Sequence, residues 1–423
     1  RTPENHGVGV VMGEAAEVRE ARPAYGPKEE HVPPCYKRTD VGVIPEEWES
    51  VPIVELARLE SGHTPSRRMP SYWAGDVPWV SLHDTDQLDS HEILRTRYTV
   101  SDEGLVHSSA RLLPKGTVVF SRTATVGKST VLGRDMATSQ DFANYICGPK
   151  LHTRFLVYLL RSMGREWERM RAGSTHNTVY MPVFERLRIP LPPLPEQHAI
   201  ARALSDVDDL ISALDKLIEK KRAIKHATMQ QLLTGRTRLP GFGGEWSKPL
   251  LGDIAAIKTG PFGSSLHERD YVPEGIPIIT VEHIGERGVL HENVPMVSDH
   301  DYARLGTYRL NADDIVFSRV GSIDRCALIR EGEAGWLFSG RLLRVRPTSE
   351  SIDSRYVSRA FASEAFRSQV RATAVGQTMP SLNTTILAMI ELHLPPLPEQ
   401  RAIATVLSDM DEEIAALERR REK

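Results

Sequence analysis

The stretch Leu-Pro-Pro-Leu-Pro-Glu-Gln runs from Leu191 to Gln197 and occurs again, unchanged, from Leu394 to Gln400. The two copies are 203 residues apart. Solenoid repeats have periods of roughly 20 to 50 residues, so this spacing indicates a whole domain with its linker, copied once. We therefore predict a pseudo-symmetric molecule with two equivalent halves.

An apolar pattern of helical spacing follows each copy of the heptapeptide. After the first copy, alternating steps of four and three residues separate Ile200, Leu204, Val207, Ile211, Leu214 and Ile218. After the second copy, the same register gives Ile403, Leu407, Met410, Ile414 and Leu417. Such steps are typical of the a and d positions of a coiled coil. We expect two equivalent helices that pack together as an antiparallel coiled coil.

The ends of these helices also carry sequence signals. Pro195-Glu196 and Pro398-Glu399 suit a first turn, because proline lacks only an N–H that would be unpaired there and glutamate faces the positive end of the helix dipole. Thr234-Gly235 predicts the end of the first helix near Leu233, so about 38 residues at about 1.5 Å each would span nearly 60 Å. The second pattern stops at Lys423, which fits either a missing C-terminal segment or a shorter helix.

A diverged domain precedes each helix. Trp48 corresponds to Trp246 and Gly62 to Gly260, while residues 77–80 correspond to 276–279 and residues 117–122 to 314–319. The apolar pieces are short and bounded by Gly, Pro and Ser, which indicates strands. Apolar residues at helical spacing between Phe155 and Met170 add a core helix.

These patterns predict an α+β fold with two pseudo-symmetric domains separated by the two long helices. The expected parts are an N-terminal extension (1–40), a first domain (41–190), a central spacer helix (191–238), a second domain (239–393) and a distal helix (394–423).

Composition excludes several classes of protein. An apolar fraction of 40% with 26% charged residues is that of an ordinary folded protein, and neither a membrane span nor a secretory signal is visible, so we expect a cytoplasmic location. Cys35, Cys147 and Cys326 are far apart without partners at metal-ligand spacing, which predicts free thiols. The net charge of −3 argues against coating nucleic acid by bulk electrostatics, so any DNA contact must be local or shared with a partner.

Motifs for catalysis are missing. Gly127-Lys128-Ser129 is similar to the end of a phosphate-binding P-loop, but Arg122 stands where that motif requires glycine, so we predict a tight turn. No nucleotide-binding, zinc-protease or amino-methyltransferase signature is present, and no nucleophile with its base repeats in both halves. Binding is therefore favoured over catalysis. The alternatives are a two-domain coiled-coil adaptor that binds proteins, and an enzyme whose motif is not recognisable.

The paired heptapeptide helices, residues 36–48 and the segment Gln230–Arg236 resemble the DNA-specificity subunit of type I restriction-modification systems. Residues 61–66, with Tyr72-Trp73 and residues 77–80, look like the opening of one class of target recognition domain. The resemblance extends over nearly the whole chain from about Tyr36. It implies two recognition domains that each read half of a bipartite asymmetric DNA target, and helices that set the spacing and dock methylation subunits.

The same resemblance implies that the chain is not an enzyme and binds no cofactor or metal. S-adenosylmethionine would bind to the methylation subunit, and ATP with Mg to the restriction subunit. The implied partners are double-stranded DNA, two methylation subunits and, where the system has them, two restriction subunits, with no membrane.

Polar loop residues of the two domains are the candidates for DNA contact, because base edges and phosphates are read by such side chains. In the first domain they are His63, Thr64, Ser66, Arg67, Arg68, Arg122, Thr123, Lys128, Ser174, Thr175, His176 and Asn177. In the second domain they are Ser264, Ser265, His267, Arg319, Ser322, Arg325, Gln377, Thr378 and Ser381. Each is equally compatible with a solvated loop, and Arg122 and Arg319, present in both copies, also fit a structural role.

Overall fold

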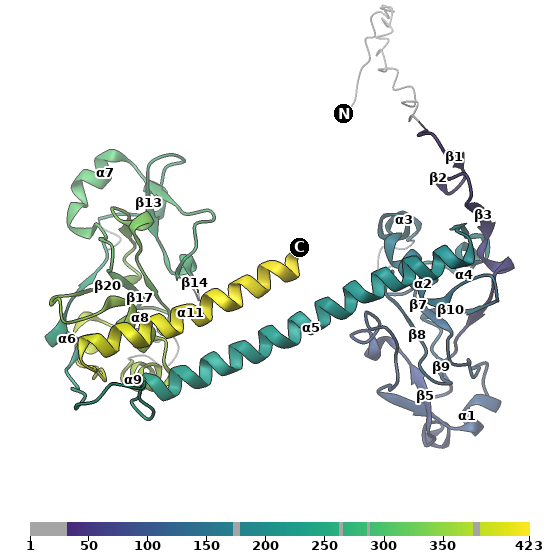
Figure 1. Cartoon of the computed structure of the whole chain (residues 1–423), viewed down its shortest axis with the longest axis horizontal. Helices are drawn as coiled ribbons and strands as arrows, with labels where there is room; N and C mark the ends of the chain where they lie inside the picture. The colour runs from purple at the N-terminus through teal and green to yellow at the C-terminus, as the bar shows by residue number, and fades with distance from the viewer. Residues whose placement is uncertain (1–31, 172–177, 262–264, 286–287, 375–380) are drawn as a thin grey trace, which may run out of the picture. The chain divides into compact units, whose positions relative to one another are not determined.

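The computed structural model describes residues 32–171, 178–261, 265–285, 288–374 and 381–423 (Figure 1). The chain divides into two compact units, residues 1–207 and 208–423. Both units mix helices and strands.

The first unit is built on a four-stranded antiparallel sheet. Its strands, in spatial order, are β4 (Ala57–Ser61), β10 (Phe142–Cys147), β7 (Val118–Ser121) and β8 (Ser129–Val131). One face packs against α2 (Thr153–Ser162), α3 (Gly164–Met170) and α4 (Met181–Arg186). Phe120, Tyr145 and Trp167 are fully buried in that core, which confirms the structural role predicted for the apolar residues of 155–170.

A smaller sheet packs against the other face of the four-stranded sheet. Its strands are β6 (Tyr98–Val100), β5 (Val77–Val80) and β9 (Ala137–Thr138), and the short helix α1 (Asp102–Val106) lies nearby. Val80, Val119 and Phe142 share the core between the two sheets. β3 (Glu49–Pro52) pairs with β11 (Arg188–Leu191), so the start of the domain meets its end just before the long helix.

The second unit repeats this topology. The main sheet has the order β12 (Ala255–Thr259), β20 (Leu342–Pro347), β17 (Ile315–Ser318) and β18 (Cys326–Leu328). The smaller sheet has the order β16 (Met296–Val297), β13 (Ile276–Ile279) and β19 (Leu337–Phe338). In both units the central strand of the smaller sheet makes one antiparallel and one parallel pairing. The remaining elements are α6 (Leu251–Ile254), α7 (Asp299–Arg304), α8 (Ser354–Phe361), α9 (Glu364–Thr373), α10 (Thr384–Ala388), β14 (Ile284–Gly285) and β15 (Gly288–Val289).

The two long helices are α5 (Leu194–Leu232) and α11 (Leu397–Glu422). α5 begins in the first unit and ends in the second, where it lies alongside α11 (Figure 1). Within the second unit, ion pairs join Asp215 to Arg421, Lys221 to Glu413, Arg222 to Glu418 and Lys225 to Asp411. From Asp215 to Lys225 along α5, the partner in α11 moves back from Arg421 to Asp411, which confirms the predicted antiparallel packing. Leu214, Ile218 and Ile414 of the apolar pattern are buried, whereas Leu204 and Val207 are 41% and 52% exposed.

The glutamine of the repeated heptapeptide makes the same three hydrogen bonds in each unit. Gln197 accepts a bond from the His152 amide (2.8 Å) and donates to the carbonyls of Lys150 (3.1 Å) and Pro192 (2.9 Å). Gln400 accepts from the Asp353 amide (2.8 Å) and donates to the carbonyls of Ser351 (3.1 Å) and Pro395 (2.8 Å). Both side chains are buried, so the repeat of sequence is a repeat of a junction between the helix start and its domain.

The glutamate of the heptapeptide is used differently in the two units. Glu196 accepts a bond from the indole of Trp48 (3.0 Å), and Glu399 accepts one from the equivalent Trp246 (3.2 Å). Glu399 also accepts hydrogen bonds from Nε and Nη2 of Arg238, each at 2.6 Å. Trp48 and Trp246, which align in the sequence, therefore make the same hydrogen bond to the glutamate of the heptapeptide.

Two local expectations have different outcomes. Residues 127–129 form a turn leading into β8, with Gly127 at φ +102°, which confirms the tight turn predicted in place of a P-loop. Residues 1–31 of the expected extension lie outside the described residues, but Tyr36–Thr39 is strand β1, which pairs with β2 (Gly42–Pro45). This hairpin lacks an apolar alternation, and its pairing therefore leaves little trace in the sequence.

Candidate nucleic-acid interface

The β7–β8 and β17–β18 turns occupy the same place in the two units, and an arginine begins each turn. Arg122 donates from Nε to the Gln140 carbonyl (2.9 Å) and from Nη1 to the Val179 carbonyl (3.3 Å). Arg319 donates from Nη1 to the Gly340 carbonyl (3.4 Å). Burial lowers the pKa of the Arg122 guanidinium. The two arginines thus tie the turn to its own domain.

The backbone around these arginines is equally alike. The Arg122 carbonyl accepts from Val179, and the Arg319 carbonyl from Leu382, both at 2.8 Å. In the first unit this bond holds the segment before α4 against the turn, and in the second unit it holds the segment before α10. The structural role weighed for Arg122 and Arg319 is the one this geometry favours, because each guanidinium donates to a carbonyl of its own domain.

Lys128 and Thr123 are also held locally. The Lys128 ammonium pairs with Asp89 and donates to the Thr85 carbonyl (3.3 Å). Thr123 forms an isolated β-bridge with Thr178. Arg325, at the position equivalent to Lys128, is exposed, and in the described part of the chain its side chain has no ion pair. The charge of Lys128 in the first-unit turn is therefore neutralised by Asp89, whereas the equivalent Arg325 in the second-unit turn is exposed.

The loop from His63 to Arg68 carries the other candidates of the first unit. The His63 carbonyl accepts from the Trp79 indole (3.0 Å), and the Thr64 hydroxyl donates to Gln140 (2.5 Å). Arg67 lies over Trp73, with its guanidinium 4.9 Å from the ring centroid, and over Tyr98 at 5.3 Å. Stacking on two rings fixes the direction of the guanidinium while leaving its edge available for a bidentate contact.

The remaining first-unit candidates of this loop, Ser66 and Arg68, are exposed. The Ser66 hydroxyl accepts from the Arg68 amide (3.4 Å), and its carbonyl accepts from the Trp73 indole (3.2 Å). The serine therefore shapes the loop, while Arg68 extends from it.

In the second unit, several candidates act through their backbone. The Ser265 carbonyl accepts from Arg304 (2.6 Å), the His267 amide donates to Asp270 (2.7 Å), and the Ser322 carbonyl accepts from the Ser318 hydroxyl. Ser381 forms a bridge with Val320, which places it beside the β17–β18 turn. Ser174, Thr175, His176, Asn177, Ser264, Gln377 and Thr378 lie outside the described residues.

A depression in the second unit brings together residues that the sequence did not single out. It has a volume of about 620 Å³, and its lining includes Tyr271, Thr280, Glu282, Arg319 and Arg341. The Thr280 hydroxyl donates to Glu282 (2.5 Å), and this bond is the main reason that the pKa of the Glu282 carboxyl is lowered. A carboxylate acceptor and an exposed guanidinium near it match the groups that read cytosine and guanine edges.

The first unit differs at the matching corner. Residues Ser339, Gly340 and Arg341 follow β19 as Ser139, Gln140 and Asp141 follow β9. Asp141 accepts from the Ser139 hydroxyl (2.8 Å). The two domains therefore place opposite charges at one position of a common fold. Only an alignment of the two corners would have indicated Arg341, and Glu282 gives no sequence signal.

Burial raises the pKa of the Cys147 thiol to about 11 and that of Cys326 to about 12, so neither is a thiolate nucleophile near neutral pH. Across the described ranges, no group of three His, Cys, Asp or Glu side chains is arranged to hold a metal ion. None of the helices in the described part of the chain has the length and apolar character of a membrane span.

Comparison with known proteins agrees with this architecture. The chain is similar to the type I restriction enzyme MjaIX specificity subunit of Methanocaldococcus jannaschii, with 26% identity over 68% of this chain and 69% of that protein. A putative type I restriction enzyme MjaX specificity subunit from the same organism is 23% identical over 92% of both chains.

Solved structures share the fold. The type I restriction-modification S subunit from M. genitalium superposes with a TM-score of 0.54 at 17% identity, covering 89% of this chain and 92% of that chain. A chain from a study of complex assembly and conformational transition in the type I system gives 0.57 at 18% identity, covering 90% and 94%. The family model described as the type I restriction modification DNA specificity domain matches residues 45–225 and 244–423. With that model matched twice, once over each repeat, the chain belongs to the family of type I restriction-modification DNA-specificity subunits.

Proposed function

We propose that this chain reads a bipartite, asymmetric DNA target, with one half-site for each recognition domain. The carrying observation is one fold with two different sets of loop residues: Asp141 against Arg341 at one corner, and a neutralised Lys128 against an exposed Arg325 at the turn. Different side chains on equivalent supports suit two different half-sites. The continuous helix α5 joins the two domains in sequence, which supports a role in setting the spacing of the half-sites.

The proposal assigns no chemistry to this chain. Methyl transfer with S-adenosylmethionine belongs to methylation subunits, and cleavage with ATP and Mg belongs to restriction subunits where the system has them. Two methylation subunits would match the two-fold repeat of the chain. The complex would act on DNA in the cytoplasm.

Docking of the methylation subunits is supported by a second apolar seam on α5. It consists of Leu210, Ala213, Leu217, Ile224 and Ala227, at steps of three and four residues interrupted only by Lys220. These apolar side chains are exposed, by 47% for Leu210, 38% for Leu217 and 44% for Ile224. The seam is separate from the residues that face α11. An unpaired heptad seam is the surface on which a partner helix packs.

The first test is to map methylated bases in cells that carry this chain with its methylation subunit, and in cells that lack only this chain. A split, asymmetric motif that requires the chain would support the proposal. Chain-dependent association with proteins, without a chain-dependent motif, would favour the adaptor alternative. Methyl transfer by the purified chain alone would favour the enzyme alternative.

Docking can be tested separately. Leu217→Glu puts a charge in the second seam, while Ser212→Glu puts the same charge on the same helix at an exposed position outside both seams. We expect the first variant to lose co-purification with the methylation subunit and the second to keep it. Equal retention by both variants would contradict docking through this seam.

A further inference from the structure

Like charges face each other across two strands of the second unit. Lys258 of β12 is the direct cross-strand partner of Arg344 of β20, and Arg346 lies two residues further along the same face. Directly opposed like charges destabilise a sheet. We call Lys258, Arg344 and Arg346 the cationic patch.

The patch has one counter-charge in the described part of the chain. Asp314 receives two bonds from Arg346, each at 2.6 Å. The other two cations contact neutral groups: Lys258 donates to the Thr307 carbonyl (3.1 Å) and lies over the Tyr308 ring (4.7 Å), and Arg344 donates to the Arg309 carbonyl (3.3 Å). Asp314 also attracts Arg344 without a direct hydrogen bond, but one carboxylate against three cations leaves two positive charges in excess.

Burial increases the cost of this arrangement. Arg344 is only 9% exposed, and among the described residues its Nε atom has no hydrogen-bond partner. Burial first, and then Arg344 and Arg346, lower the pKa of the Lys258 ammonium. Leu342, on the same face of β20, belongs to the core between the two sheets, so the cations continue that face beyond the core.

The first unit shows that the fold does not require these charges. Glu60 of β4 faces Asn144 of β10 in the same register as Lys258 faces Arg344. Glu60 forms an ion pair with Arg111, and the Asn144 amide donates to the Thr138 hydroxyl (2.9 Å). The corresponding surface of the first unit is thus balanced. A costly charge cluster that is present in only one of two copies is expected at a functional site.

We propose that the cationic patch binds a backbone phosphate of duplex DNA, and that the first domain has no equivalent contact. This inference rests on the proposed function, which it deepens by giving the second domain a sequence-independent anchor. A phosphodiester supplies the negative charge that the patch lacks, and charge-assisted bonds to phosphate are the strong kind. The contact positions the domain, while the loop residues remain responsible for reading bases.

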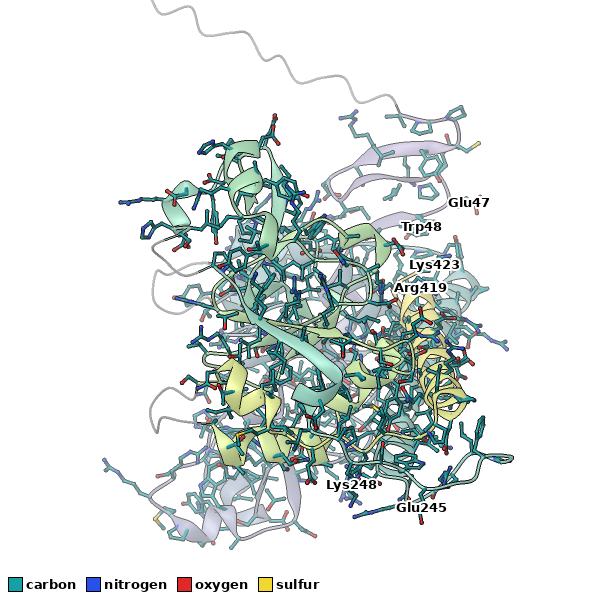
Figure 2. The ribbon with its side chains drawn as sticks, turned by 90° about the vertical axis from the view of Figure 1, so that its left-hand side faces the viewer. Glu47, Trp48, Glu245, Lys248, Arg419 and Lys423 are labelled. Atoms are coloured by element: carbon teal, nitrogen blue, oxygen red, sulfur yellow. The ribbon has the colours of Figure 1, made fainter. Side chains whose placement is uncertain are left out.

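The test uses two substitutions that give the second unit the residues of the first. The variants are Lys258→Glu, and Lys258→Glu combined with Arg344→Asn. The matched control is Lys248→Glu, the same chemical change at an exposed position in the loop before α6, which Figure 2 labels together with Glu245. Both patch variants remove a like-charge pair, so their melting temperatures should equal or exceed that of the unchanged protein.

The measurement is the salt dependence of DNA affinity of the complex with its methylation subunits. Binding is titrated at several NaCl concentrations on two duplexes of equal length, one with the mapped target and one unrelated. Each phosphate contact contributes about 0.9 to the slope of log K against log salt. We expect the slope to fall by about 1 for both patch variants on both duplexes, and to stay unchanged for Lys248→Glu.

The outcomes separate the two proposals. Slopes of the patch variants equal to the unchanged protein, or shifted equally by Lys248→Glu, would overturn the phosphate site while leaving the proposed function intact. Failure of the unchanged complex to prefer its target would overturn the proposed function, and failure to bind either duplex would overturn both. If 10 mM inorganic phosphate raises the melting temperature of the unchanged protein but not of the patch variants, while the variants bind DNA with an unchanged salt slope, the patch is a site for free phosphate and the DNA contact is refuted.

Discussion

Replacing Gln197 by leucine should destabilise the first unit by about 2 to 4 kcal/mol. The substitution removes the three hydrogen bonds to His152, Lys150 and Pro192, while the apolar replacement has a similar volume. The bond to Pro192 is buried, and stranding a buried acceptor costs about 1 to 3 kcal/mol. The two part-buried bonds add about 0.5 to 1.5 kcal/mol each, and burial of the leucine side chain offsets part of the total.

The repeat provides a second measurement of the same quantity. Gln400→Leu removes the equivalent bonds in the second unit, so its cost should agree with that of Gln197→Leu. Gln230→Leu makes the identical change at an exposed position of α5 and should cost less than about 0.5 kcal/mol. Native-state hydrogen exchange, followed by mass spectrometry, resolves the two units and reports which one is destabilised.

The reasoning would be refuted by either of two results. A loss for Gln197→Leu no larger than that of the Gln230 control would mean that the buried amide is not needed at the junction. Destabilisation spread equally over both units would mean that each junction is not local to its own domain.

Three further predictions concern the recognition domains. Arg341→Ala should weaken target binding by about 1 to 3 kcal/mol and relax specificity at one position of one half-site, as seen by binding to a panel of single-base variants of the mapped target. Arg325→Ala should weaken binding to the full target by about 1 to 3 kcal/mol if the guanidinium reads a base; unchanged affinity in the assembled complex would remove it from the interface. Arg122→Ala and Arg319→Ala should lower the melting temperature of their own domains, because each removes hydrogen bonds from the guanidinium to carbonyls of the same domain, whereas a loss of DNA affinity at unchanged stability would return both residues to the interface.

The framework of the fold could be predicted because it rests on local signals. The heptapeptide combines a helix-start proline with a buried glutamine, and the apolar steps of four and three mark the helix face that becomes buried at Leu214 and Ile218. The strands were visible as short apolar runs bounded by breakers. These signals depend on residues near one another in the chain, and the second copy doubled each of them.

The binding surface could be predicted only in outline. Arg122 and Arg319 look like free loop cations in the sequence, but their donors meet carbonyls from the corner after β9 or β19 and from the segment before the next helix. Arg341 and Glu282 come from separate parts of the chain and meet because the strands before them, β19 and β13, pair in parallel within the smaller sheet. Long-range convergence of this kind is not encoded in spacing.

The net charge of −3 fits a DNA-reading chain once the charges are placed. Pairs such as Lys225 with Asp411 and Arg222 with Glu418 neutralise each other and hold α5 against α11. What distinguishes the two domains is the local imbalance at Lys258 and Arg344, where the first domain has Glu60 and Asn144. Because phosphate contacts act over short distances in salt, such an imbalance has more effect on DNA binding than the total charge does. The two domains would then divide the work unequally, with the second providing the electrostatic anchor and both providing base readout.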